Sequence, residues 1–236
     1  MLTFKVIKEQ ISISEARFNK KIACPSVSFP PVLTCRSDTP CKQVCYAGYA
    51  FRIYPNVKKA YNKNYQLYKS NSQKYFELIQ AYLEKRQPEY FRWNVSGDIP
   101  AVEYVKGVCQ TCRNMSKTKH LLFTKQYELL IESMETSDFI FNLKNLSIRI
   151  STFPGLDIPN ELNSFPRAYY QPPIVGKYAG IPNENRIDWT NDIICPGKCE
   201  PCERVCWNNS DNVIFPHHSG ALARSKMLKK HQSNDV

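Results

Sequence analysis

The chain has 236 residues, 42% of them hydrophobic, and a formal net charge of +11 from 32 Lys and Arg against 21 Asp and Glu. This length is sufficient for a sizeable core, so we expect residues 1–236 to form a single domain. The positive charge favours an anionic substrate or a nucleic acid as a partner. No stretch reaches the roughly 20 apolar residues of a membrane span, and the first residues lack a signal-peptide pattern. We therefore expect no membrane partner and a cytoplasmic protein.

Near the amino terminus, the segment 42–69 combines six basic residues and six tyrosines with no acidic residue. Such a segment could follow a phosphate backbone while its rings stack on bases. Tyr61, Tyr65 and Tyr68 recur at helical spacing, however, which favours one buried helix face with solvated lysines opposite. The buried face is the prediction that we prefer.

Helical and strand patterns alternate along the middle of the chain. We expect helices over 73–86, 99–115 and 126–134, and strands over 90–95, 121–123 and 146–150. Strands separated by helices of this length pair in parallel through right-handed crossovers. The predicted fold class is therefore α/β, with a TIM-like or partial (β/α) barrel and cysteine-rich metal-binding loops.

The last third of the chain has few helix signals. The Pro-rich stretch 154–182 predicts extended strands and loops. His217 and His218 could bind a metal or a substrate, and a surface role is at least as compatible with their position. From about residue 225 we expect a basic, frayed tail.

Eight of the ten cysteines fall into two groups of four. The first group is Cys24, Cys35, Cys41 and Cys45, and the second is Cys195, Cys199, Cys202 and Cys206. The second group has the spacing C-x3-C-x2-C followed by a fourth cysteine after three more residues, which is typical of a [4Fe–4S] cluster. Thiolates two or three residues apart on a tight turn can reach neighbouring metal atoms. We therefore predict that these eight cysteines include the metal ligands.

Two other interpretations of the cysteines compete with iron–sulfur. Disulfides are disfavoured because a cytoplasmic protein is kept reduced. Zinc is the harder alternative, but zinc ribbons usually pair two C-x2-C knuckles across a dozen or more residues, whereas here four cysteines lie within twelve residues. The pair Cys109 and Cys112 lies on the apolar stripe of a predicted helix and is expected to be core.

Small polar or charged residues follow the three predicted strands. Since parallel α/β folds place their chemistry at the carboxyl ends of the strands, these residues are the candidates for cofactor binding. They are Ser96, Gly97, Asp98, Thr124, Lys125 and Ser151. Ser96, Asp98 and Thr124 could equally cap the helices that follow. We expect Gly97 to let the backbone approach a ligand closely.

Several short elements together resemble the signature of the gene-product-88-like family of phage proteins. They are Cys24-Pro25, Cys41-x3-Cys45-Tyr46-Ala47, Ser96-Gly97-Asp98, Cys195-Pro196 and Cys206-Trp207. They occur in order across about residues 24 to 218. The resemblance implies a phage-encoded protein of the host cytoplasm and does not imply a particular reaction.

A more remote resemblance is to radical S-adenosylmethionine enzymes, whose partial (β/α)6 barrel carries a three-cysteine motif early in the chain. Cys35-x5-Cys41-x3-Cys45 lies early here, and Ser96-Gly97-Asp98 stands where that family has a Gly-Gly-Glu motif. The early spacing differs from C-x3-C-x2-C. From these patterns we predict a [4Fe–4S] protein that could also bind S-adenosylmethionine. The alternative is a zinc-stabilised nucleic-acid-binding protein without catalysis.

Overall fold

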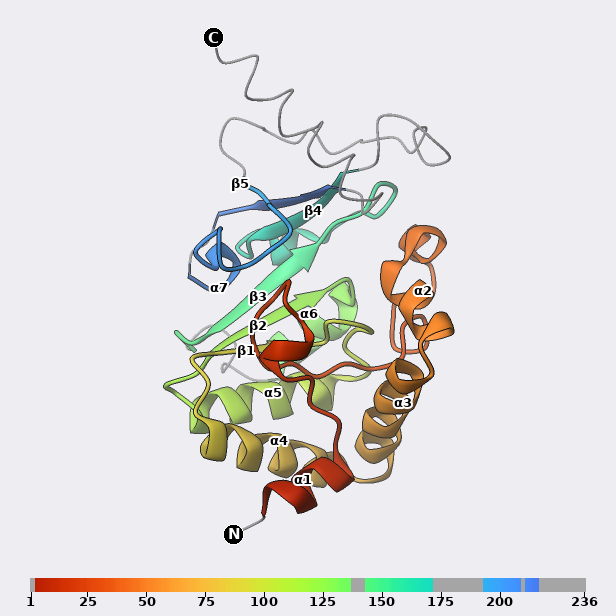
Figure 1. The fold of residues 1–236 in the computed structure, drawn as a ribbon. Helices are drawn as coiled ribbons and strands as arrows, with labels where there is room; N and C mark the ends of the chain where they lie inside the picture. The colour runs from red at the N-terminus through yellow and green to blue at the C-terminus, as the bar shows by residue number, and fades with distance from the viewer. Residues whose placement is uncertain (1–2, 137–142, 172–192, 209–210, 217–236) are drawn as a thin grey trace.

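The computed structural model describes residues 3–136, 143–171, 193–208 and 211–216 (Figure 1). Its helices are α1 (Phe4–Gln10), α2 (Tyr46–Ile53), α3 (Pro55–Ser70), α4 (Ser72–Arg86), α5 (Val102–Asn114), α6 (Tyr127–Glu135) and α7 (Val205–Asn208). Its strands are β1 (Tyr90–Trp93), β2 (Lys119–Thr124), β3 (Leu146–Ser151), β4 (Arg167–Gln171), β5 (Ile193–Ile194) and β6 (Val213–Pro216). Three short 3₁₀ helices complete the described elements: η1 (Ala16–Phe18), η2 (Pro40–Val44) and η3 (Asn160–Leu162).

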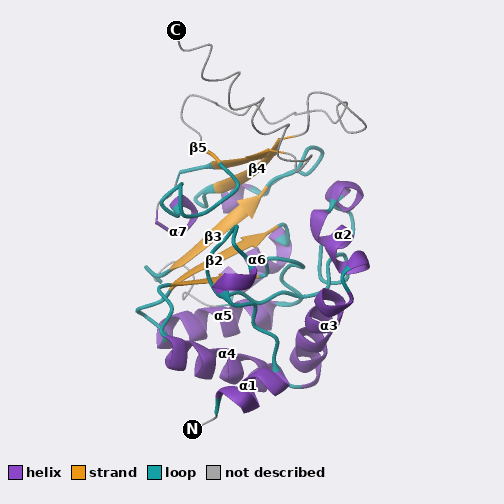
Figure 2. Ribbon diagram, in the orientation of Figure 1, coloured by secondary structure: helices purple, strands orange, loops and turns teal. Residues whose placement is uncertain are grey.

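The strands form one parallel sheet in the order β1-β2-β3-β4-β6-β5 (Figure 2). Helices α5 and α6 lie in the crossovers from β1 to β2 and from β2 to β3, and the loop that ends in α7 joins β5 to β6. In the described part of the chain β1 does not pair with β5, so the sheet is open. The α/β class is thus confirmed.

The TIM-like or partial barrel is not confirmed. Alternating helix and strand patterns specify parallel pairing between neighbours. Closure into a barrel needs hydrogen bonds between the first and last strands as well, which depend on strand tilt and stagger that no local pattern encodes. The predicted strands at β1, β2 and β3 and the predicted helices at α4, α5 and α6 are present, with ends shifted by up to three residues.

The two faces of the sheet have different neighbours, because successive side chains of a strand point to opposite faces. On one face, Trp93, Leu122 and Ile150 belong to the main core, to which α4, α5 and α6 also contribute. Figure 1 shows α4 and α5 along this face. Leu121 belongs to a smaller cluster with Trp207 of α7. The second cysteine group therefore lies against the face that these helices leave open.

The free edge of β1 is covered by residues 25–29. The amide of Arg92 donates to the carbonyl of Pro25 (3.0 Å), and the amide of Phe29 donates to the carbonyl of Ser96 (3.0 Å). A covered edge cannot pair with another chain. The same hydrogen bonds place the start of the first cysteine group beside the sheet.

The tyrosines of α3 confirm the prediction of a buried helix face. The ring of Phe29 lies 5.6 Å from the rings of both Tyr65 and Tyr68, and Tyr68 is buried. Tyr49 and Tyr54, which lie outside that stripe, are more than half exposed. Both of these rings remain available to stack on a partner.

The described part of the Pro-rich stretch contains β4, as predicted, and the short 3₁₀ helix η3, which was not predicted; residues 172–182 lie outside the described residues. His217, His218 and the basic tail from about residue 225 also lie outside them.

Candidate metal and ligand site

The second cysteine group forms the connection between β5 and β6. Cys195 directly follows β5, and its amide donates to the carbonyl of Ile214 in β6 (2.8 Å). Gly197 with φ 85° turns the chain, and Glu203 and Arg204 also have positive φ values. These turns fold the loop back on itself. As a result all four cysteines of the group line one small cavity of about 30 Å³.

Hydrogen bonds join this loop to residues 21–23. The amide of Cys199 donates to the carbonyl of Lys21 (2.8 Å). The guanidinium of Arg204 donates to the carbonyls of Ile22 (2.8 Å) and Ala23 (3.1 Å). The loop is therefore held against the segment that immediately precedes the first cysteine group.

Arg149 of β3 holds the other end of the loop. Its side chain is fully buried, and it donates to the carbonyls of Cys206 (3.0 Å), Val205 (3.2 Å) and Asp211 (2.5 Å). Burial lowers the pKa of Arg149, with the neighbouring Cys206 and Asp211 opposing that shift. A charged side chain so deeply buried is stable only while its donors are satisfied.

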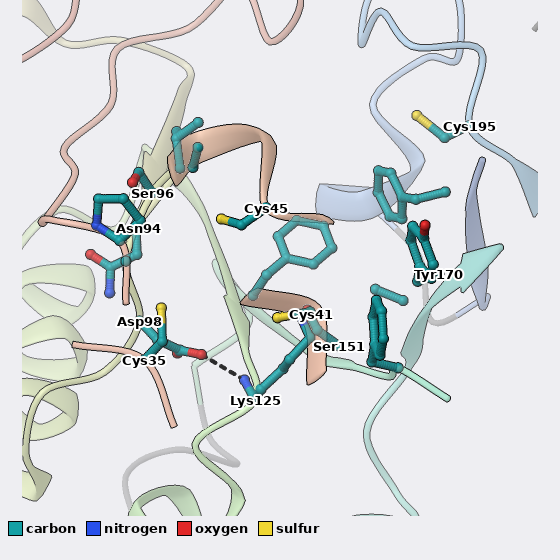
Figure 3. Close-up of a pocket in the computed structure, with 18 of the residues that line it drawn as sticks. Cys35, Cys41, Cys45, Asn94, Ser96, Asp98, Lys125, Ser151, Tyr170 and Cys195 are labelled. Atoms are coloured by element: carbon teal, nitrogen blue, oxygen red, sulfur yellow. Dashed lines mark hydrogen bonds between the residues drawn. The ribbon is translucent and has the colours of Figure 1, made fainter. Parts of the chain in front are cut away.

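The first cysteine group divides between two places. Cys24 is buried and belongs to the smaller cluster, against which Cys199 and Cys206 pack. Cys35, Cys41 and Cys45 instead line a larger cavity of about 340 Å³. Cys195 and Cys199 line this larger cavity as well, so it receives thiols from both ends of the chain (Figure 3).

Several thiols accept hydrogen bonds. The amide of Gly48 donates to Sγ of Cys45 (3.2 Å), the hydroxyl of Thr39 donates to Sγ of Cys41 (3.2 Å), and the amide of Gly197 donates to Sγ of Cys195 (3.4 Å). Donors of this kind stabilise negative charge on sulfur, as a thiolate that binds a metal requires.

Burial is the main influence on the acidity of these thiols. It raises the pKa of Cys35 to about 12, with the Asp98 carboxylate adding to the shift. It also raises the pKa of Cys199 to about 12 and that of Cys206 to about 11, and the positive charge of Arg92 opposes both shifts. Without a metal these thiols are protonated at neutral pH. A metal ion would therefore have to displace protons to bind them.

The donor set suits a thiolate-bound metal, although the side chains are not gathered around one point. All ten cysteines are free thiols. Within the described ranges, no three His, Cys, Asp or Glu side chains are close enough to hold a metal ion. Cysteine sulfur suits iron–sulfur clusters and zinc. Binding would require the loop thiols to move closer together.

The residues predicted to bind a cofactor are brought together. Ser96, Gly97, Asp98, Lys125 and Ser151 all line the larger cavity, and the sixth candidate, Thr124, is buried beside Asp98. Figure 3 shows Ser96 and Asp98 on one side of the cavity and Cys195 on the other.

The Asp98 carboxylate joins the loops that follow β1 and β2. It accepts hydrogen bonds from the hydroxyl of Thr124 (2.7 Å), the amide of Lys125 (2.8 Å) and the amide of Ile99 (2.8 Å). Burial raises the pKa of Asp98, and these hydrogen bonds oppose the shift. Both carboxylate oxygens thus already have donors from the protein.

Gly97 has a role that the sequence did not indicate. Its φ is +74°, and a Cβ atom there would lie 2.5 Å from the Thr34 hydroxyl and 2.9 Å from Cβ of Phe29. The close approach that glycine permits is therefore to the segment covering the β1 edge.

Two cavity-lining residues, Arg92 and Asn94, were missed by the sequence analysis. Both lie in or directly after β1 and alternate with the core residue Trp93. The period-two pattern of β1 could have identified Arg92, because Arg92 alternates with the core residues Phe91 and Trp93. Asn94 lies past the end of the strand with φ 46°, so no strand period indicates it.

Cys109 and Cys112 are core residues, as predicted. They are 3% and 0% exposed on α5 and belong to the main core. Burial raises the pKa of Cys109 to about 12. Neither lines the larger or the smaller cavity described above.

The family model for gene product 88 matches residues 4–153. The chain belongs to the gene product 88 family. The matched region contains the first cysteine group and strands β1 to β3, and it ends before the second group. No curated protein and no solved structure matches the chain. The remote resemblance to radical S-adenosylmethionine enzymes has no support from these comparisons. Among the described helices, none has the length and apolar character needed to cross a bilayer.

Proposed function

We propose that this member of the gene product 88 family is an iron–sulfur protein in which Cys195, Cys199, Cys202 and Cys206 hold a [4Fe–4S] cluster. The observation that carries the proposal is that all four thiols line one cavity on a loop that Arg204 joins to residues 22–23 and whose C-terminal end Arg149 holds. When bound, such a cluster supplies one-electron redox chemistry. The host cytoplasm, where such thiols stay reduced, is the proposed location.

Around this site the protein supplies positive charge and rigidity. The Arg92 charge lowers the pKa values of Cys199 and Cys206 against the effect of burial. Arg149 and Arg204 orient the loop through its backbone carbonyls and through those of residues 22 and 23. These contacts favour bound thiolates and hold the loop against its neighbours, while its thiols would still have to move closer together to bind a metal.

Cys35, Cys41 and Cys45 form a second candidate set of ligands under this proposal. They line the larger cavity together with Cys195 and Cys199. Three thiols from one segment beside an open cavity are compatible with a metal that keeps one coordination position for another ligand. Cys24 is buried in the cluster against which Cys199 and Cys206 pack, and it is the least exposed of the eight candidate cysteines.

S-adenosylmethionine is the proposed second cofactor, with the larger cavity as its site. Both oxygens of the Asp98 carboxylate already accept hydrogen bonds from the protein. Asp98 could therefore bind the amino group of S-adenosylmethionine only if it lost one of these hydrogen bonds. Calorimetric titration of S-adenosylmethionine into wild type and Asp98→Ala tests this role. Saturable binding that Asp98→Ala loses would support it, and absence of binding in both proteins would remove the cofactor from the proposal.

Metal analysis tests the iron–sulfur proposal itself. Protein purified without oxygen is expected to be brown, to contain iron and acid-labile sulfide in similar amounts, and to absorb near about 400 nm. Stoichiometric zinc with negligible iron would overturn the proposal.

The second candidate function is a zinc-stabilised protein that binds nucleic acid without catalysis. The observation that favours it is the exposed aromatic and basic surface of α2 and α3, where Tyr49 and Tyr54 lie among Arg52, Lys58 and Lys59. Such a surface can contact phosphates and stack on bases. Colourless, zinc-containing protein that binds a single-stranded oligonucleotide with a steep salt dependence would favour this function.

A further inference from the structure

Three buried polar atoms at the end of β1 have no hydrogen-bond partner among the described residues. They are Nε of Arg92, Nδ2 of Asn94 and Oγ of Ser96, and all three residues line the larger cavity. Leaving a buried donor unpaired is unfavourable, so most buried polar groups are paired. Three such atoms on β1 and the loop directly after it indicate a bound group that is absent from the described chain.

The backbone and neighbouring groups hold two of these side chains in place. The Asn94 Oδ1 atom accepts a hydrogen bond from the Tyr104 hydroxyl (2.8 Å), which leaves the amide donors unused. The amide of Ser96 donates to the Ser28 hydroxyl (3.2 Å), and the carbonyl of Ser96 accepts from the amide of Phe29 (3.0 Å). These bonds do not involve the Ser96 hydroxyl, which remains able to bind a ligand.

Arg92 adds positive charge to the part of the cavity that Asn94 and Ser96 line. Its guanidinium lies over the ring of Phe123, 4.3 Å from the centroid. Among the described residues that line the cavity, Asp98 alone is acidic, and its oxygens already accept three hydrogen bonds. Lys21 and Lys125 also line the cavity. Unused donors and an excess of positive charge favour an anionic ligand.

Aromatic side chains line another part of the cavity. The rings of Phe153 and Tyr170 are stacked at 4.6 Å, and those of Phe123 and Phe215 meet edge to face at 5.6 Å. Flat apolar groups pack well against such surfaces. The volume of about 340 Å³ lies within the range of small-molecule sites.

We propose that this cavity binds a small organic anion, with a carboxylate or phosphate group held by Arg92, Asn94 and Ser96 and an aromatic ring packed against Phe123 and Tyr170. The site lies in the cavity proposed above for S-adenosylmethionine, so the two ligands would compete for it, and binding of the anion does not require the iron–sulfur cluster. The sequence predicted Ser96 as a site residue. Arg92 and Asn94 are further residues of the proposed site.

Isothermal titration calorimetry of the full-length protein tests the proposal with benzoate and phenyl phosphate as probes and benzyl alcohol as the neutral control. The two anions distinguish a carboxylate from a phosphate ligand. We expect saturable binding of at least one anion to wild type and none of benzyl alcohol. Asn94→Asp keeps the acceptor for Tyr104 but replaces the amide donors with a charged oxygen, so binding should weaken by about tenfold or more.

Two further variants keep the test decisive. Ser96→Ala removes one donor and leaves the backbone bonds intact, so affinity should fall several-fold even if Asn94→Asp does not fold. Asn114→Asp adds the same charge on the exposed part of α5 and should bind like wild type. Absence of binding of both anions to wild type would overturn the proposal, as would equal affinities of wild type and Ser96→Ala. Iron measured on the same samples separates this outcome from a failure of the iron–sulfur proposal.

Discussion

The cysteines of this chain have different roles because their surroundings differ. Cys109 and Cys112 are thiols in a helix-lined core, whereas Cys199 and Cys202 lie on a loop with positive φ values and arginine neighbours. A thiol in an apolar core acts as a small hydrophobic group. A thiol on a tight loop among other thiols can bind a metal.

Replacing Cys199 or Cys202 with Ala is expected to lower the iron content strongly. Cys109→Ala should leave iron unchanged and cost about 1 kcal/mol of unfolding free energy through lost packing. Iron and sulfide analysis with a urea unfolding series checks both effects. Equal loss of iron in all three variants would contradict the separation of core and loop thiols.

His120 is expected to make stability depend on pH. Burial lowers the pKa of His120 from 6.5 to about 4, and its ring stacks on Trp93 at 6.0 Å. Because the unfolded chain binds this proton more tightly, the contribution of His120 to stability is complete above about pH 6.5 and is lost as the pH falls towards 4.

Unfolding free energies of wild type and His120→Phe between pH 7.5 and pH 5 measure this contribution. Wild type should lose more stability than the variant over that range, since every other titrating group is common to both proteins. Parallel pH profiles would show that His120 does not contribute.

Elements are positioned by close contacts that sequence patterns do not display. Helices α4 and α5 approach each other at Gly107, where a Cβ atom would lie 2.1 Å from Cε2 of Phe76. Phe76 in turn contacts the rings of Trp93 and Tyr104. The glycine therefore permits the two helices to pack against the aromatic part of the core.

Gly107→Ala should destabilise the protein by about 1–3 kcal/mol, although Ala favours a helix by about 1 kcal/mol over Gly. Gly48→Ala on α2 is the matched control, because its Cβ would lie 3.6 Å from the nearest atom. Chemical denaturation measures both. Adding Phe76→Leu to Gly107→Ala should restore part of the loss, and no recovery would argue against the predicted clash.

Arg149 connects β3 to the loop that carries the second cysteine group. Arg149→Met keeps the apolar stem but leaves the carbonyls of Val205, Cys206 and Asp211 without these donors. We expect a loss of about 2–4 kcal/mol and faster amide exchange in residues 195–208. Arg17→Met, at an exposed site, is the control and should change neither quantity. An equally small effect in both variants would show that Arg149 does not hold the loop.

At the scale of the whole molecule, the two ends of the chain meet at one face of the sheet. Cys35, Cys41 and Cys45 line a cavity that Cys195 and Cys199 also reach. The loop of the second group is hydrogen-bonded to residues 21–23. A metal bound at this face would therefore link segments that lie far apart in sequence.

Metal loading is accordingly expected to raise the melting temperature of the whole protein. A ligand that binds only the folded state stabilises it in proportion to the logarithm of its concentration over its dissociation constant. Differential scanning calorimetry before and after anaerobic chelation of iron measures the difference. The same melting temperature in both states would mean that bound metal contributes nothing to global stability.

The sequence by itself determined the parallel α/β class, the positions of β1 to β3 and α4 to α6, and the core positions of Cys109 and Cys112. These features depend on local periodicity, which a chain displays wherever one side of an element is buried. It also indicated several of the cavity residues, because Ser96, Asp98, Lys125 and Ser151 follow or end strands whose carboxyl ends share one edge.

Only the tertiary structure decided the open sheet, the separation of Cys24 from Cys35, the use of the Asp98 oxygens within the protein, and the unpaired donors of Arg92 and Asn94. Each depends on contacts between residues distant in sequence, such as the hydrogen bonds from Thr124 to Asp98 and from Arg204 to Ile22. A local pattern specifies which side of a strand or helix is buried. It does not specify which distant segment covers that side, because the partner is selected by the packing of the whole chain.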